Sequence, residues 1–214
     1  MKLSEAIPKI TSALNVRFKD LYKSNQLVDI KINKGNTGKL LEKLIGLPPG
    51  NSLRDFEDGE LKTNKCDAFG NPIETVFISQ ISKRFDDLVD PSVSFEESWI
   101  YHKIKRLLYV PVDKSSPNPE NWKFLDCIFL EISEGSPIYI QLEEDFEAIK
   151  SKIKDDITKG DGFIHTSSGK YIEVRTKDSL PYSPIYSNKY SDYISDKNYA
   201  FYFKKAFVKV INPV

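Results

Sequence analysis

The sequence predicts a mixed α/β fold. One amphipathic stretch, Leu142 to Thr158, places apolar residues on a single stripe at helical spacing, which indicates a long helix. Two other stretches favour strands, since Ile73 to Ser79 largely alternates apolar with polar residues and Leu107 to Val112 is a short apolar run. At 214 residues the chain is long enough to form one large domain or two small lobes with a sizeable core.

The first part of the chain is predicted to be helical. Apolar residues recur at near-helical spacing from Leu3 to Tyr22, which predicts one or two short helices. A turn cluster, Asn33 to Gly38, leads into another helix from about Thr37 to Ile45. Gly46 then ends that helix, because glycine is the residue most often found just past a helix C-terminus.

A hairpin and several further segments are predicted after this helix. Glu60 to Lys62 is interpreted as extended, the turn residues Cys66 to Pro72 follow, and Ile73 to Ser79 is predicted to return as the second strand. The remaining segments are predicted, in chain order, to be a polar loop at Ser82–Ser94, a helix at Glu96–Arg106, strands at Leu107–Val112 and Phe124–Ile132, the helix at Leu142–Thr158, a hairpin formed by Phe163–Thr166 and Lys170–Arg175 around Ser167–Gly169, a long loop at Asp178–Asn198 and an apolar closing segment at Tyr199–Val210.

Composition argues against several classes of protein. The longest apolar runs, such as Ile128 to Leu130, fall far short of the roughly 20 residues that a membrane span needs, and the N-terminus lacks an export pattern, so we expect a cytoplasmic protein without membrane contact. The two cysteines, Cys66 and Cys127, do not suggest a disulfide framework. Lysine and arginine total 31 against 31 acidic residues, so a nucleic acid could be attracted only by an uneven distribution of charge.

The stretch from Asp55 to Lys62 carries the clearest chemical signal. Side chains alternate along an extended chain, so Glu60 and Lys62 share one face while Leu61 points into the core. Asp55 and Glu60 offer the carboxylate oxygens that Mg²⁺ prefers, and Lys62 could orient an attacking water or offset transition-state charge. Taken alone, the pattern is also compatible with a solvated strand edge, because 29% of the residues are charged.

Several ordered blocks together carry a more specific signal. They are Lys34-Gly35-x-x-Gly38-x-Leu40-Leu41-Glu42, Asp55-Phe56, Gly59-Glu60-Leu61-Lys62-Thr63, Asp67 to Phe77, His102 to Arg106, Tyr109 to Val112, Arg175-Thr176-Lys177 and Phe201-Tyr202-Phe203-Lys204-Lys205-x-Phe207. In this order the chain resembles the MutH family, which comprises the mismatch-repair strand-nicking endonuclease and related GATC-cutting type II restriction enzymes. The match runs over most of the chain.

The resemblance implies an architecture and an activity. The fold would be that of the PD-(D/E)xK nucleases, a mixed sheet flanked by helices in two lobes around a DNA cleft. Residues 1–214 would form one endonuclease domain, with the metal site in a lobe at about 30–115 and a DNA-reading lobe at about 120–214 together with the N-terminal helices. The activity would be Mg²⁺-dependent hydrolysis of phosphodiester bonds in double-stranded DNA at a short site such as GATC.

The resemblance also implies roles for individual residues. It assigns the metal to three acidic residues, Glu42, Asp55 and Glu60. It assigns three lysines to the nucleophile and the phosphates, with Lys62 positioning the nucleophile and Lys34 and Lys103 contacting the scissile or flanking phosphates. It assigns DNA reading to the C-terminal segments, with Arg175 and Lys177 at base edges, where they suit the acceptors of guanine, Tyr202 against the adenine whose methylation the family senses, and Lys204 beside it.

One departure from the family leaves the metal aspartate open. Only four residues separate Asp55 from Glu60, fewer than family members usually have. Either the connecting turn is tighter here, or Asp58 takes the ligand role, because Asp58, Glu60 and Lys62 would share a face if the strand began early. A second departure is the tyrosine-rich segment Tyr182 to Tyr199, which does not match the family.

Two biological roles and one non-catalytic alternative follow. The enzyme would either cut both strands unaided, as a restriction enzyme does, or nick one unmethylated strand with help from a MutL-like activator. Alternatively, the chain would be a DNA-binding module that kept the nuclease fold without the activity. For a nuclease, we expect Lys62→Ala or Glu60→Ala to abolish Mg²⁺-dependent cleavage with little change in melting temperature.

Overall fold

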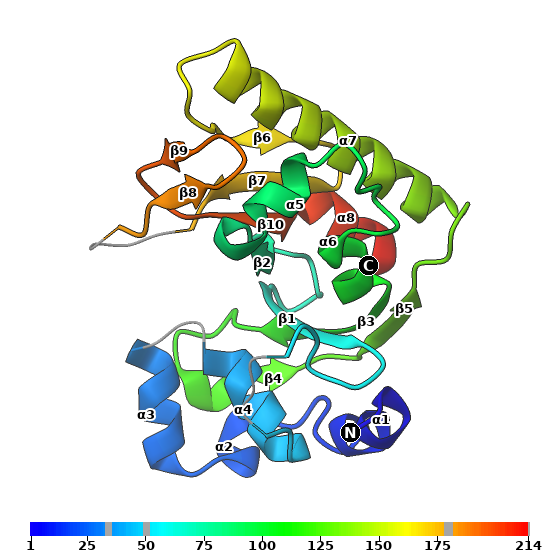
Figure 1. Ribbon diagram of the computed structural model, residues 1–214. Helices are drawn as coiled ribbons and strands as arrows, with labels where there is room; N and C mark the ends of the chain where they lie inside the picture. Colours follow the sequence, from blue (N-terminus) through cyan, green and yellow to red (C-terminus); the bar gives the residue numbers. More distant parts are fainter. Residues whose placement is uncertain (33–35, 49–51, 178–181, 214) are drawn as a thin grey trace. The chain divides into compact units, whose positions relative to one another are not determined.

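Figure 1 shows the computed structural model, which describes residues 1–32, 36–48, 52–177 and 182–213. The chain divides into two compact units. The first comprises Met1–Glu74, Lys103–Glu131 and Val208–Val214, and the second comprises Thr75–His102 and Ile132–Phe207. The N-terminal helices therefore group with the segments around Glu60, whereas the sequence analysis placed them with the DNA-reading segments.

The first unit is built on a four-stranded sheet. In this sheet β1 (Glu60–Cys66) runs parallel to β3 (Arg106–Asp113), and β3 also pairs antiparallel with β4 (Lys123–Phe124) and β5 (Ile128–Glu131). The helices of this unit are α1 (Leu3–Thr11), α2 (Phe18–Leu21), α3 (Ser24–Ile32), α4 (Asn36–Ile45) and the 3₁₀ helix η2 (Pro119–Asn121). Apolar residues from α1, α2 and α4 share one core with Leu61, Leu108 and Val110 of the two parallel strands. This core holds β1, and with it Glu60 and Lys62, in place.

The second unit contains an antiparallel sheet and a separate hairpin. The sheet has the order β2-β10-β7-β6, formed by β2 (Val76–Gln80), β10 (Tyr199–Phe203), β7 (Ile172–Thr176) and β6 (Ser167–Ser168). The hairpin pairs β8 (Ile185–Ser187) with β9 (Asp192–Ser195). The helices are η1 (Ser82–Arg84), α5 (Phe85–Val89) and α7 (Pro137–Thr158), while α6 (Trp99–Ile104) and α8 (Lys205–Ile211) carry the chain from the second unit into the first.

Helix α7 fixes the β6–β7 turn through one carboxylate. Ser136 caps the helix by accepting a hydrogen bond from the Tyr139 N–H at 3.2 Å, and Pro137 suits its first turn. Asp145, only 4% exposed, accepts hydrogen bonds from three consecutive backbone N–H groups, those of Lys170, Tyr171 and Ile172. Gly169 is required beside it, because a Cβ atom there would lie 2.3 Å from the Asp145 Cγ.

The prediction of a mixed α/β fold is confirmed, but the predicted hairpin after Glu60 is wrong. The chain does turn at Asp67–Gly70, where the Asp67 carboxylate accepts hydrogen bonds from the N–H groups of Phe69 and Asn71. Beyond an isolated bridge between Cys66 and Pro72, however, β2 leaves β1 and pairs with β10 in the other sheet. The PD-(D/E)xK topology stays a prediction.

Smaller differences concern local segments. Ser82–Ser94 holds η1 and α5 rather than only loop, Phe124–Ile132 is split into β4 and β5, and the predicted loop at Asp178–Asn198 contains the β8–β9 hairpin. Helix α3 was not predicted, and the hairpin around Ser167–Gly169 is formed by β6 and β7, with Ser167 already in a strand. Among the helices in the described ranges, none is long and apolar enough to cross a membrane.

Candidate active site and DNA-contact residues

The start of β1 ties Asp55 to Glu60. The Leu61 N–H donates to Asp55 Oδ2 at 3.0 Å, and the Asp55 N–H donates to Glu60 Oε2 at 3.2 Å. These two bonds fold the short connection back on the strand. The spacing of four residues is therefore compatible with Asp55 lying beside Glu60, as the tighter-turn alternative required.

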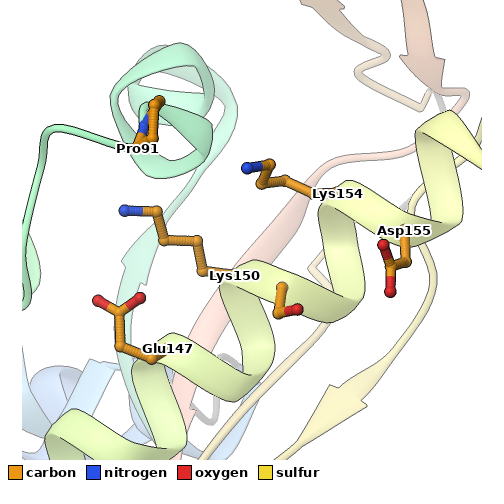
Figure 2. A pocket seen from close by; sticks show the side chains of 6 residues that line it. Pro91, Glu147, Lys150, Lys154 and Asp155 are labelled. Carbon is orange, nitrogen blue, oxygen red and sulfur yellow. The ribbon is translucent and has the colours of Figure 1, made fainter.

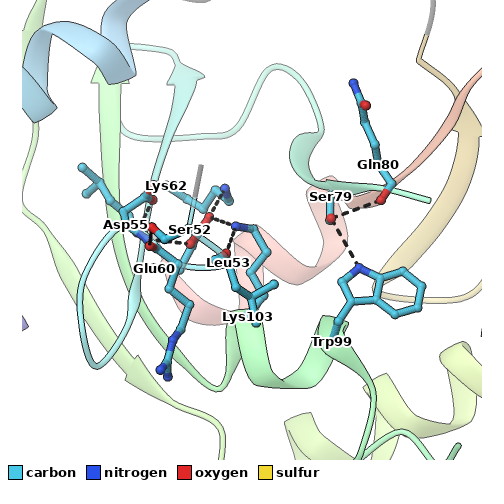
Figure 3. A network of polar contacts seen from close by, with 11 residues as sticks. Ser52, Leu53, Asp55, Glu60, Lys62, Ser79, Gln80, Trp99 and Lys103 are labelled. Carbon is cyan, nitrogen blue, oxygen red and sulfur yellow. Dashed lines mark hydrogen bonds and ion pairs between the residues drawn. The ribbon is translucent and has the colours of Figure 1, made fainter. Parts of the chain in front are cut away.

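Glu60 is the centre of a buried charge cluster. Its side chain is 1% exposed, and its Oε1 atom lies 2.5 Å from the ammonium nitrogen of Lys62 and 2.8 Å from that of Lys103. Both lysine side chains are only 13% exposed, and Lys103 also donates to the Leu53 carbonyl at 2.5 Å. Figure 3 shows these groups meeting around Glu60. Lys62 therefore does not point into bulk solvent, which removes the interpretation of this stretch as a solvated strand edge.

Helix α4 adds a third carboxylate to this cluster. Burial raises the pKa of Glu42, the neighbouring negative charge of Asp55 raises it further, and Lys62 partly offsets the effect. Glu60 also contributes to the rise, so all three predicted metal carboxylates interact electrostatically. Gly38 allows the helix to approach the strand, because a Cβ there would lie 3.3 Å from the Thr63 Oγ1.

The Asp58 carboxylate contacts groups outside this cluster. Its Oδ1 accepts a hydrogen bond from the Leu3 N–H at 2.8 Å, and its Oδ2 forms an ion pair with Arg106 at 2.8 Å. Burial opposes ionisation of Asp58, but the Leu3 N–H and the Arg106 guanidinium outweigh it and hold the pKa of this carboxyl below its usual value. Both oxygens are thus used to anchor the start of α1 and the start of β3. Of the two aspartates, Asp55 is the one placed with Glu42 and Glu60.

The carboxylate oxygens of Glu42, Asp55 and Glu60 are of the chemical type that binds Mg²⁺. Carboxylate oxygens are the ligands that this ion prefers, and it needs only one or two of them beside waters and substrate phosphate. Within the described ranges, no three His, Cys, Asp or Glu side chains are grouped closely enough to enclose an ion by themselves. Because the two lysine ammonium groups lie on Glu60 Oε1, a metal at that oxygen would have to compete with them.

Three of the four predicted DNA-contact residues lie together in the second unit. The Arg175 guanidinium lies over the Tyr202 ring, 4.3 Å from its centre, and donates to the Thr75 Oγ1 at 2.6 Å. Tyr202 packs edge-on against Phe77, and the Lys177 ammonium lies 5.7 Å from the Phe77 ring centre. Burial raises the pKa of Tyr202, and the Arg175 charge partly offsets that rise.

Thr75 and Phe77 were missed by the sequence analysis. Phe77 reaches this group because β2 pairs with β10, which places it opposite Tyr202. The available signal was the alternation of Val76 to Gln80, with Phe77 on the exposed side of a strand. That signal identifies a strand face but not the neighbouring strand.

Comparisons with known proteins identify relatives of one kind. No protein-family model matches the chain. The DNA mismatch repair protein MutH of Buchnera aphidicola is 29% identical over 192 residues, which cover 86% of this chain and 81% of the relative. MutH of Haemophilus influenzae is 31% identical over 59% of this chain and 56% of its own length, and MutH of Citrobacter koseri is 38% identical over 42% of this chain and 39% of its own length. The chain is similar to MutH proteins over most of its length. It spans about half or less of the lengths of the last two relatives.

Two other predicted site residues have separate outcomes. Lys204 donates to the Ser168 Oγ at 2.8 Å and to the Gly169 carbonyl at 2.7 Å, so its ammonium holds the β6–β7 turn, and its DNA contact stays a prediction. Lys34 lies outside the described residues. Its phosphate contact also stays a prediction.

Helix α7 lines a pocket of about 270 Å³ that does not resemble a nuclease site. Figure 2 shows Lys150 and Lys154 projecting from the helix toward Pro91, with Glu147 and Asp155 nearby. Lys150 is 6% exposed and donates to the Val93 carbonyl at 2.6 Å. Its ammonium is thereby committed to the backbone. The charges are balanced, and the pocket lacks the grouped carboxylates of the Glu60 cluster.

Proposed function

We propose that this chain, which is similar to MutH proteins, is a Mg²⁺-dependent endonuclease that nicks one strand of double-stranded DNA during mismatch repair, at a short site such as GATC. The observation that supports it most strongly is the cluster at the start of β1, where Glu42, Asp55 and Glu60 interact and Lys62 and Lys103 neutralise Glu60. The mismatch-repair role rests on the names of the relatives.

The residues of the cluster would have different roles at the scissile phosphate. Asp55 and Glu60 would hold the metal, with Glu42 as an additional acid, directly or through water. When bound, Mg²⁺ lowers the pKa of a coordinated water and stabilises charge on the leaving oxygen. Lys62 positions the nucleophile through its ammonium, and Lys103 offsets phosphate charge. Because Glu42 must be ionised to help hold a cation and burial raises its pKa, metal affinity should fall as the pH is lowered toward that pKa.

The cluster in the second unit would read the DNA site. Arg175 carries two N–H groups suited to the O6 and N7 acceptors of guanine, and its packing on Tyr202 fixes the plane of the guanidinium. Tyr202 would lie against the adenine whose methylation blocks the reaction. Lys177 would add a further base-edge or phosphate contact from the end of β7.

A plasmid assay tests the activity and the role together. Purified protein is incubated with supercoiled plasmids in which the GATC sites are unmethylated, hemimethylated or fully methylated, with Mg²⁺ and with EDTA. We expect Mg²⁺-dependent nicks in unmethylated strands, none in Lys62→Ala, and normal nicking in Lys19→Ala, a matched variant of an exposed lysine in the same unit. A MutL-like partner should increase the rate.

Other outcomes separate the alternatives. Complete linearisation by the protein alone would assign a restriction role. DNA binding in Ca²⁺ followed by no cleavage in Mg²⁺, with or without the partner, would assign a non-catalytic module and would refute the proposed activity.

A further inference from the structure

The first unit holds a second polar pocket that the proposed nuclease chemistry does not use. It has a volume of about 350 Å³, at the small end of the range for ligand-binding pockets. Its walls come from the C-terminal half of β1, the residues just before β2, the loop after β3 and the η2 segment. They include two lysines, one glutamate, an indole ring and two prolines, namely Lys65, Lys114, Glu74, Trp122, Pro117 and Pro119.

The aromatic wall of this pocket is held in a fixed orientation. The Trp122 Nε1–H donates to the Ser116 carbonyl at 2.7 Å. The Trp122 carbonyl accepts a hydrogen bond from the Phe18 N–H at 2.8 Å, and the Phe18 ring packs edge-on against the indole. Because both the backbone and the ring of Trp122 are tied to neighbours, the pocket does not require a partner to form it.

Positive charge exceeds negative charge inside the pocket. The Lys114 ammonium lies over the indole, 4.7 Å from the ring centre, and donates to the Thr37 Oγ1 at 2.8 Å. Burial lowers the pKa of Lys114, Glu74 opposes that fall, and Lys65 adds to it, so the three charged groups interact. Two ammonium groups face one exposed carboxylate. An anion would relieve the repulsion between the lysines.

We propose that this pocket binds a nucleotide, with the ammonium groups of Lys65 and Lys114 on the phosphate and the Trp122 indole against the base. Two lysines and one glutamate give the pocket a net positive charge, which a phosphate would offset. Once the Lys114 ammonium moves from the ring to the phosphate, the indole and its flanking prolines offer a flat apolar surface on which a base can stack. Such stacking tolerates any base. The nucleotide is either free or part of a DNA strand, since both present the same phosphate and ring.

Tryptophan fluorescence gives a direct test, because the chain has only two tryptophans. In a Trp99→Phe variant, Trp122 is the sole indole. We expect deoxyadenosine 5′-monophosphate to quench it saturably, and neutral deoxyadenosine or inorganic phosphate alone to bind more weakly. Lys114→Gln in this background should weaken nucleotide binding about tenfold, the loss of one charge-assisted contact. Lys43→Gln, an exposed lysine of the same unit, should bind as the parent does.

A second variant replaces Trp99→Phe if that variant does not fold, and two outcomes would refute the proposal. Trp99 is 6% exposed, so if Trp99→Phe fails to fold, Trp122→Phe in the natural chain is used instead and must abolish the quenching. Absence of saturable quenching up to about 10 mM nucleotide, or equal affinity of Lys114→Gln and its parent, would overturn the proposal.

A last arm identifies the source of the nucleotide. Competition by a duplex without GATC sites would point to a DNA strand, whereas nucleotide binding that survives a saturating duplex would point to a free nucleotide. All titrations are done in EDTA and involve no cleavage. Their failure would therefore leave the nuclease proposal standing, and failure of the plasmid assay would leave this pocket untouched.

Discussion

Replacing Glu60 by glutamine removes the negative charge on which the ammonium groups of Lys62 and Lys103 converge. The side chain keeps its size, so the perturbation is electrostatic rather than one of packing. In the native chain both lysines lie within 2.8 Å of one Glu60 oxygen, and all three side chains are at most 13% exposed. The sequence alone led us to expect little change in melting temperature for Glu60→Ala, and the burial of Glu60 alters that expectation.

The size of the effect follows from what remains after the substitution. Removing one partner of a buried ion pair costs roughly 3–5 kcal/mol, because it strands the opposite charge. Two features reduce that cost here. Lys103 keeps its hydrogen bond to the Leu53 carbonyl, and Asp55 and Glu42 still provide negative charge nearby. We therefore expect Glu60→Gln to lower the free energy of unfolding by about 1–3 kcal/mol, a drop in melting temperature of about 3–9 °C for a chain of this size.

Urea and thermal unfolding in EDTA at low ionic strength measure this loss. Asp55→Asn serves as the matched control, because Asp55 is exposed, and its substitution should change the stability by less than Glu60→Gln does. Lys62→Met combined with Glu60→Gln should recover part of the loss, since it removes one of the two positive charges that Glu60 neutralises in the native chain. A Glu60→Gln variant within about 0.5 kcal/mol of the natural chain would refute the burial argument.

The same variant tests whether Glu60 binds a cation. A divalent ion that binds only the native chain stabilises it by mass action. Ca²⁺ or Mg²⁺ should therefore raise the melting temperature of the natural chain more than that of Glu60→Gln. An equal rise in both would remove Glu60 from the metal site while leaving the electrostatic argument intact.

Three further predictions address other parts of the chain. Burial and the charge of Asp55 raise the pKa of Glu42, so its ionised form destabilises the folded state above that pKa. Glu42→Gln should therefore raise stability at pH 7.5, by no more than about 1 kcal/mol because solvent screens the half-buried carboxylate, and should have little effect near pH 4, as pH-dependent urea unfolding can measure. A loss of stability at pH 7.5 would contradict the burial and repulsion of the Glu42 carboxylate. Arg175→Lys keeps the charge but not the planar group over Tyr202, so the preference for GATC over a scrambled site should fall about tenfold or more in competition binding. An unchanged ratio of the two affinities would exclude base reading by Arg175. Asp145→Ala leaves three backbone N–H groups at the start of β7 without their acceptor and should cost about 3–5 kcal/mol in urea unfolding, whereas a cost below about 1 kcal/mol would show that water replaces the carboxylate.

Local patterns predicted the parts of the site that depend on a single element. Side-chain alternation places Glu60 and Lys62 on one face of a strand whatever the strand packs against, and β1 begins at Glu60. Helical periodicity likewise predicted α4, with Leu41 and Ile45 buried. The grouping of Glu42 with Asp55, by contrast, was predicted from the family resemblance. Helical periodicity identifies the buried face of a helix but not the strand against which that face packs.

Non-local pairing limited the rest of the prediction. The strand that contains Phe77 was predicted, but its alternation fits an edge of either sheet, and short turns usually join neighbouring strands. The preference for a local hairpin was overridden when β2 paired with β10, and Thr75 and Phe77 were missed as neighbours of Arg175 and Tyr202 for that reason. The local sequence pattern therefore predicts that a segment is a strand, whereas the strand with which it pairs depends on how the core packs.

The short connection before Glu60 shows how a shorter spacing than the family's can still place Asp55 beside Glu60. Gly59 has no room for a side chain, since a Cβ there would lie 2.3 Å from a Leu3 methyl group and 2.9 Å from the Arg106 carbonyl. Asp58 is pinned by the Leu3 N–H and by Arg106, so the connection is packed tightly against α1 and β3. This anchoring forces the preceding residues to turn back, and the Asp55 carboxylate then meets the Leu61 N–H. A connection with fewer residues can thus deliver its aspartate beside Glu60, because the residues that remain are fixed by contacts rather than by length.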